Sequence, residues 1–111
     1  MIKIEVIVRP SALDAVLAIR HEWMTGMTLS EVKGCGRQKG HVEIYRGAEY
    51  EVSLNSKLKI EMVIPEPLAP RILYELERAL KTGKIGDGKI FTSRVDEAIR
   101  IRTGERGEDA L

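Results

Sequence analysis

The apolar residues of this chain recur with two different periods, and the order of these periods limits the folds it can adopt. Isoleucine and valine alternate with charged residues at 2–8, which is typical of a strand with one buried face. Apolar spacings of three and four residues then predict a helix from about 11 to 23. The same two patterns predict a strand at 27–33, a strand at 57–64, a helix that opens at 65–67 and buries Ala69 to Leu80, and a short strand at 90–95.

Two successive β-α-β units predict an α+β, ferredoxin-like fold, the split β-α-β arrangement (βαββαβ). The 111 residues have the size of one hydrophobic core, so we expect a single domain over 1–111. Two helices on one face of the sheet leave the other face with apolar side chains such as Ile7 and Val63. Self-association would cover that face in so small a domain.

Local signals refine the ends of these elements. Ser11 is a candidate N-cap for the first helix, and Gly83 is placed to end the second. Isoleucine and arginine alternate at 98–104, which predicts a small additional strand. In the strand at 27–33, the side chains expected to point inward are those of Met27, Leu29 and Val32.

Composition excludes several classes of protein. The 18 lysines and arginines against 17 acidic residues give a net charge of +1, whereas a general nucleic-acid binder needs a basic face. One cysteine, Cys35, cannot form an intrachain disulfide, and two histidines do not make a structural zinc set. No segment approaches the roughly 20 apolar residues of a membrane span. We therefore expect a cytoplasmic protein without direct membrane insertion, and a charged tail at 105–111 that frays.

A glycine-rich segment at 82–89 is the first candidate for chemistry. Gly83, Gly88 and Lys89 match the first part of the phosphate-loop pattern, but Ile90 stands where that loop needs serine or threonine. The segment also leads from a helix to a strand, so no helix N-terminus follows it. A nest of backbone amides with one lysine remains possible, and a plain glycine turn is the alternative.

Further cations occur in two other segments. Arg100 and Arg102 would project from the same side of the predicted strand and suit a phosphate or carboxylate, although a solvated strand face with salt bridges is the simpler alternative. The segment 34–40 offers three glycines with Arg37 and Lys39, or is a flexible linker. The long connection at 41–56 has no clean period, although 42–45 could pair locally; such connections are usually functional or disordered.

Four segments together resemble the P-II family of nitrogen signal-transduction proteins. They read Val-Lys-Gly-Cys-Gly-Arg-Gln-Lys-Gly-His at 32–41, Tyr-Arg-Gly-Ala-Glu-Tyr at 45–50, Thr-Gly-Lys-Ile-Gly-Asp-Gly-Lys-Ile-Phe at 82–91 and Arg-Ile-Arg-Thr-Gly-Glu at 100–105. The resemblance covers essentially the whole chain in order and spacing. It implies a cytoplasmic homotrimer of ferredoxin-like subunits that binds ATP or ADP in clefts between subunits and, with Mg-ATP bound, 2-oxoglutarate.

The resemblance also assigns loops and residues. It implies a partner-docking T-loop at about 37–56, a B-loop at about 82–88 and a C-loop at about 102–111. The residues implied for the nucleotide are Thr28, Gly34, Arg37, Glu61, Val63, Gly86, Asp87, Gly88 and Lys89, with Arg100 and Arg102 reaching the phosphates from the neighbouring subunit. Those implied for 2-oxoglutarate are Gln38, Lys39, Gly40, Lys57, Ile85 and Gly86, with Gln38 also a ligand of Mg²⁺. Tyr50 matches the tyrosine that is uridylylated in many bacteria.

By this resemblance the chain is a regulator rather than an enzyme. The partners met in the family are an ammonium transporter, uridylyl- and adenylyltransferases, a sensor kinase and other enzymes of nitrogen metabolism, with no nucleic acid among them. Two other classes stay open from the residues: a slow nucleotide-hydrolysing enzyme, because three cations could stabilise a phosphoryl transition state, and a ferredoxin-like interaction module without ligands.

Overall fold

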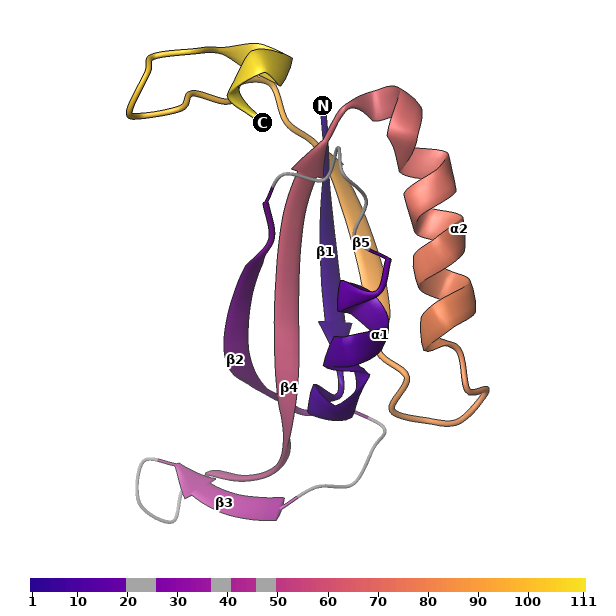
Figure 1. The fold of residues 1–111 in the computed structure, drawn as a ribbon. Coiled ribbons are helices and arrows are strands. Elements are labelled where there is room, and N and C mark those ends of the chain that lie inside the picture. The colour runs from indigo at the N-terminus through magenta and orange to yellow at the C-terminus, as the bar shows by residue number, and fades with distance from the viewer. Residues whose placement is uncertain (20–25, 37–40, 46–49) are drawn as a thin grey trace.

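The computed structural model describes residues 1–19, 26–36, 41–45 and 50–111 (Figure 1). Its elements are β1 (Ile2–Val8), α1 (Leu13–Leu17), β2 (Thr28–Gly34), β3 (His41–Tyr45), β4 (Tyr50–Ile64), α2 (Ala69–Leu80) and β5 (Lys89–Arg94). Short 3₁₀ turns occupy Pro10–Ala12, Glu66–Leu68 and Gly107–Ala110. None of the helices described in these ranges is long and apolar enough to cross a bilayer.

The sheet has the strand order β2-β4-β1-β5, and every pairing is antiparallel. β1 and β4 are therefore the central strands, and they are also the strands that α1 and α2 follow in the chain. This is the ferredoxin-like arrangement that the two β-α-β units predicted. β3 pairs with β4 outside this path.

The hydrophobic core confirms the period-2 patterns at 2–8 and 57–64. Ile4 and Val6 of β1 lie opposite Met62 and Ile60 of β4, and all four side chains are buried. Val16 of α1 joins the same cluster, as do three residues of α2, Ala69, Ile72 and Leu76. Both helices thus cover one face of the sheet, because the core strand residues all share one parity.

The opposite face of the sheet carries charges at its centre. The Lys59 ammonium lies 2.8 Å from the Glu5 carboxylate and 3.0 Å from that of Glu61, and Lys3 lies 3.5 Å from Glu61. Hydrogen bonds to Glu5 and Glu61 raise the pKa of Lys59, and the bond from Lys59 lowers the pKa of Glu61. Phe91 of β5 is 51% exposed on this same face. No helix covers it in the part of the chain that the structure describes.

The ends of three elements differ from the sequence-based expectation. Ser11 is not an N-cap, because a 3₁₀ turn that starts at Pro10 precedes α1 and no side chain caps either segment. The helix predicted to run to about residue 23 is shorter, because α1 ends at Leu17 with Ala18 as its C-cap. α2 ends at Leu80 with Lys81 as its C-cap, so Thr82 rather than the predicted Gly83 follows the cap. On the edge strand β2, Leu29 lies opposite the buried Ile60, on the face of the helices, but remains 42% exposed, whereas Val32 lies opposite Lys57 on the other face.

The long connection at 41–56 contains a hairpin. β4 is 15 residues long and begins at Tyr50, well before the predicted strand at 57–64. Its first part pairs with β3, with Tyr45 opposite Tyr50 and His41 opposite Leu54. Figure 1 shows the hairpin beyond one end of the sheet formed by β2, β4, β1 and β5.

The C-terminal part contradicts two expectations. Residues 98–104 form a turn instead of a strand, with the Arg100 carbonyl accepting from Gly104 N at 2.8 Å and the Glu105 carbonyl accepting from Arg100 N at 2.9 Å. Gly104 has a φ of +74°, a left-handed conformation that reverses the chain at little cost for glycine. The tail is not frayed, because Arg100 Nη2 donates to the Leu111 carbonyl at 2.9 Å.

Candidate functional site

The glycine-rich loop between α2 and β5 is seated directly on β1. A Cβ built on Gly88 would lie 1.8 Å from the Ile7 carbonyl oxygen, and Gly88 has a φ of +95°. Only glycine fits both the close approach and the backbone conformation. The loop therefore enters β5 against the end of β1, where Lys89 lies opposite Ile7.

Asp87 shapes this loop from within. One oxygen of its carboxylate accepts from the backbone amides of Thr82 at 2.8 Å and Gly83 at 2.9 Å. The other accepts from the Thr82 hydroxyl and, at 3.2 Å, from Arg9 Nη2. The Thr82 hydroxyl and amide, together with the Gly83 amide and the Arg9 charge, lower the pKa of Asp87. The resemblance implies that Asp87 is one of the residues at the nucleotide phosphates; within one chain its carboxylate bonds to the loop itself and holds the loop closed.

These contacts predict that the fold loses stability at acidic pH, and that the substitution Asp87→Asn makes this loss smaller. The folded-state pKa of Asp87 lies below the unfolded one, so the unfolded chain binds more protons between the two values. The stability contributed by Asp87 is complete above about pH 4, the ordinary range for aspartate, and is lost as pH falls through the lowered folded-state pKa. Melting temperatures measured from neutral to acidic pH should fall less steeply for Asp87→Asn than for wild type. Parallel curves would contradict this role.

Two cations converge on the carbonyl of Gly86. Arg9 Nε donates to it at 3.2 Å and Lys57 Nζ at 3.4 Å. Burial and the nearby Arg9 charge lower the pKa of Lys57. Sequence reasoning missed Arg9, because it lies 77 residues from Gly86 and shows no local motif beyond a cation before Pro10.

A cleft of about 740 Å³ opens beside this loop on the face of the sheet away from the helices. It combines glycine-rich backbone with three lysines, a chemistry suited to an anionic ligand. The residues that line it are Ile7, Gly34, Cys35, Gly36, Asn55, Lys57, Lys84, Ile85, Gly86, Asp87, Gly88, Lys89 and Phe91. The structure thus brings seven residues of the expected site into one cleft: Gly34, Lys57, Ile85, Gly86, Asp87, Gly88 and Lys89.

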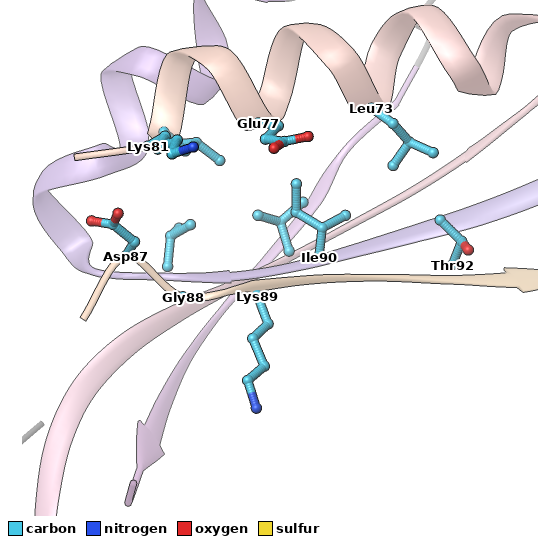
Figure 2. Close-up of a pocket in the computed structure, with 11 residues that line it drawn as sticks. Leu73, Glu77, Lys81, Asp87, Gly88, Lys89, Ile90 and Thr92 are labelled. Carbon is cyan, nitrogen blue, oxygen red and sulfur yellow. The ribbon is translucent and has the colours of Figure 1, made fainter. Parts of the chain in front are cut away.

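A second cavity of about 520 Å³ lies on the helix side of the same loop (Figure 2). Glu77 of α2 and Lys81, the residue after this helix, line it, and its walls include apolar Leu73 and Ile90. Figure 2 shows the Lys89 side chain pointing from β5 away from this cavity. The cationic cleft on the other side is therefore the better candidate for an anion.

Other expected residues lie elsewhere along the open face or outside the description. Thr28 and Glu61 are register partners on β2 and β4, and Val63 lies two residues further along β4. The Glu61 carboxylate is paired with Lys59 and Lys3 of its own chain. Arg37, Gln38, Lys39 and Gly40 lie outside the described residues. Tyr50 is described only by its backbone, as the first residue of β4.

Arg100 and Arg102 lie at the end of the sheet opposite to Lys89. Lys89 pairs with Ile7 near the end of β1, whereas Val95 N donates to the carbonyl of Met1, and the arginines follow from there (Figure 1). Arg100 Nη1 contacts the Glu105 carboxylate at 2.9 Å. A hydrogen bond from Thr103 and then the Arg100 charge lower the pKa of Glu105. One chain therefore does not bring these arginines to Lys89.

In the described ranges, protein side chains alone would not complete a site for the predicted Mg²⁺. Among those residues, no group of three or more histidine, cysteine, aspartate or glutamate side chains could hold an ion. The expected ligand Gln38 lies outside them. The donor set of the described cleft, lysines and backbone amides, fits phosphate or carboxylate oxygens rather than a bare cation.

Comparisons with known proteins agree with this fold. The family model of nitrogen regulatory protein P-II matches residues 1–105. Nitrogen regulatory protein P-II of Rhodospirillum rubrum and that of Bradyrhizobium diazoefficiens are each 54% identical over 112 residues, with all of both chains covered.

Solved structures give the same result. The structure of B. subtilis GlnK aligns with a TM-score of 0.79 and 40% identity, covering 99% of this chain and 97% of that one. A B. subtilis GlnK-ATP complex aligns with the same TM-score at 33% identity, covering 99% and 96%. The relatives bear the name of a regulatory protein, as expected for a regulator rather than an enzyme. With its ferredoxin-like sheet, its glycine loop on β1 and these matches over its length, the chain belongs to the nitrogen regulatory protein P-II family.

Proposed function

We propose that this regulator senses ATP or ADP and 2-oxoglutarate and passes their status to partner proteins through the T-loop. The observation that carries the proposal is the cationic cleft, where Gly86, Gly88 and Lys89 meet Lys57. A nest of backbone amides with adjacent lysines suits phosphate oxygens. A solved relative that shares the fold is described as a GlnK-ATP complex, which supports a nucleotide as the ligand.

The nucleotide site would be shared between subunits of a homotrimer. The phosphates would lie against residues 86–89 and Arg37, and the adenine and ribose against Thr28, Gly34, Glu61 and Val63. Arg100 and Arg102 would come from the neighbouring subunit. Support comes from their position at the sheet end opposite to Lys89, since only a second copy can bring the two ends together. The open sheet face, with Phe91 half-exposed, would be covered by the same assembly.

The second ligand, 2-oxoglutarate, would occupy the same cleft next to the nucleotide. Its contacts would be Gln38, Lys39, Gly40, Lys57, Ile85 and Gly86. Lys57 supports this assignment, because its ammonium reaches the Gly86 carbonyl inside the cleft and carries a lowered pKa. Mg²⁺, when bound, would neutralise oxygens of ATP and 2-oxoglutarate, with Gln38 among its ligands and the other oxygens drawn from the ligands themselves.

The T-loop at about 37–56 would be the output. The β3–β4 hairpin projects beyond the sheet (Figure 1). β4 is one unbroken strand that begins in this hairpin and continues along the cleft, which it lines with Asn55 and Lys57. Ligands that bind one conformation of this segment more tightly would shift its population. Uridylylation of Tyr50 would add charge and bulk there. In the cytoplasm, the protein would dock on an ammonium transporter, a uridylyl- or adenylyltransferase, a sensor kinase or another enzyme of nitrogen metabolism.

Titration calorimetry tests the proposal. We expect ATP to bind, ADP to compete with it, and 2-oxoglutarate to release heat only when Mg-ATP is present. Since coupling between two sites is reciprocal, saturating 2-oxoglutarate should tighten ATP binding about five-fold or more. If the folded protein does not bind ATP, the nucleotide assignment is wrong. If it binds ATP but gives no response to 2-oxoglutarate, the assignment of 2-oxoglutarate as second ligand is wrong.

A further inference from the structure

We infer that the cavity on the helix side of the glycine-rich loop binds an α-amino acid with an apolar side chain, whose ammonium pairs with Glu77 and whose carboxylate pairs with Lys81. This cavity lies on the other side of the sheet from the side chain of Lys89 and the cationic cleft (Figure 2). The inference therefore goes beyond the proposed function and does not rest on it.

The cavity has the size and the walls of a small-molecule site. Its volume of about 520 Å³ falls within the range of ligand pockets, roughly 300–1,000 Å³. Val6 and Val8 of β1, which line it, are buried, whereas Leu73, Leu80 and Ile90 pack on the core and are only partly buried. These three side chains leave apolar surface uncovered beside the cavity. An apolar group of a ligand would remove that surface from water.

Four charged residues line the cavity, and two of them are engaged elsewhere. The Asp87 carboxylate accepts hydrogen bonds from its own loop and from Arg9. The Lys89 side chain points to the other side of the sheet (Figure 2). One carboxylate, that of Glu77, and one ammonium, that of Lys81, remain. In the part of the chain that the structure describes, neither of these two groups forms an ion pair or a side-chain hydrogen bond.

The spacing of these two groups favours a ligand that carries both charges. Residues four apart lie on the same face of a helix, with their Cβ atoms about 5–6 Å apart, and Leu73 precedes Glu77 by the same interval. An α-amino acid bears its ammonium and its carboxylate on one carbon, so it can pair with Glu77 and Lys81 while its side chain packs on Leu73. A simple amine or a simple anion would pair with only one of them. An exposed ion pair between Glu77 and Lys81 contributes little, so a ligand replaces it at small cost.

Ligand-observed NMR titration of the full chain with L-leucine tests the site. Two matched probes each lack one charge: 4-methylpentanoate has the side chain and carboxylate of leucine without the ammonium, and 3-methylbutylamine has the ammonium without the carboxylate. We expect L-leucine to bind, and each matched probe to bind about ten-fold more weakly, because each loses a hydrogen bond between charged groups. Absence of L-leucine binding, or equal binding of all three compounds, would overturn the inference.

Three variants assign the two charges. We expect Glu77→Gln to weaken L-leucine about ten-fold and to leave 4-methylpentanoate unchanged, because that probe has no ammonium to lose a partner. Lys81→Met should weaken L-leucine to the same extent and leave 3-methylbutylamine unchanged. The matched control is Glu75→Gln on the same helix, since Glu75 pairs with Arg71 at 3.4 Å and does not line the cavity. This control should bind all three compounds as the wild type does.

The outcomes separate the two ligands of the cavity from each other and from the nucleotide. Glu77 and Lys81 are exposed, so melting curves of the variants should match that of the wild type. Variants that weaken L-leucine and its matched probe equally would contradict the assigned charges. ATP titrations of the same proteins complete the test: a chain that binds ATP but not L-leucine overturns this inference alone, and one that binds L-leucine but not ATP overturns only the nucleotide proposal.

Discussion

Replacing Gly88 with alanine should destabilise the protein by about 2 to 5 kcal/mol and abolish its nucleotide site. The new Cβ would fall 1.8 Å from the Ile7 carbonyl oxygen, on a residue whose φ is +95°. The left-handed conformation costs a non-glycine residue about 1–2 kcal/mol, and forcing atoms into filled space adds about 1–3 kcal/mol. Because the neighbour is the backbone of a central strand, it cannot turn aside as a side chain would. Urea unfolding of the two proteins measures the difference.

Gly83→Ala is the matched control for Gly88→Ala. Gly83 has a similar φ of +81°, but a Cβ there meets nothing within 4 Å. It should lose only the conformational part, about 1–2 kcal/mol. Equal losses in the two variants would contradict the close seating of the loop on β1.

Lys89→Ala should weaken ATP binding by about 30-fold or more, which corresponds to the roughly 2–5 kcal/mol expected when one partner of a desolvated charge pair is removed. The stability should hardly change, because the Lys89 side chain is exposed and has no core contact to lose. Calorimetry with ATP gives the affinity, and urea unfolding gives the stability.

Lys81→Ala controls for the loss of a positive charge beside the same loop. Lys81 borders the helix-side cavity, across the sheet from the side chain of Lys89 (Figure 2). Its removal should change ATP affinity only slightly. Comparable weakening by both substitutions would point to the net charge of the loop instead of a contact in the cleft.

The sequence predicted the elements that bury one face. β1, the later part of β4 and α2 were found because their apolar periods correspond to side chains such as Ile4, Ile60 and Ile72, which have no exposed surface. The same reasoning failed at 98–104, where isoleucine and arginine also alternate. Ile101 is 97% exposed there, so the alternation reflects no buried face. A period is informative about structure only where burial causes it.

Sequence reasoning found only those parts of the candidate site whose residues stand together in the chain or match the family. The glycines and Lys89 stand together in the sequence, and family resemblance placed Lys57 beside them. Arg9 could not be found in this way, because its contacts to Gly86 and Asp87 depend on the pairing of β1 with β5. The hydrogen bonds of the Asp87 carboxylate within the loop were missed for the same reason, since its partners become visible only once the loop is closed.

The central claim is that one nucleotide site takes its cations from two copies of the chain. It is tested most directly by mixing Lys89→Ala with Arg100→Ala, each of which should bind ATP poorly alone. After unfolding and refolding together, about a quarter of the sites in randomly mixed rings would combine Lys89 of one subunit with Arg100 of its neighbour. We predict that calorimetry then recovers about that fraction of sites at wild-type affinity. Mixtures that bind no better than the separate variants would contradict a shared site.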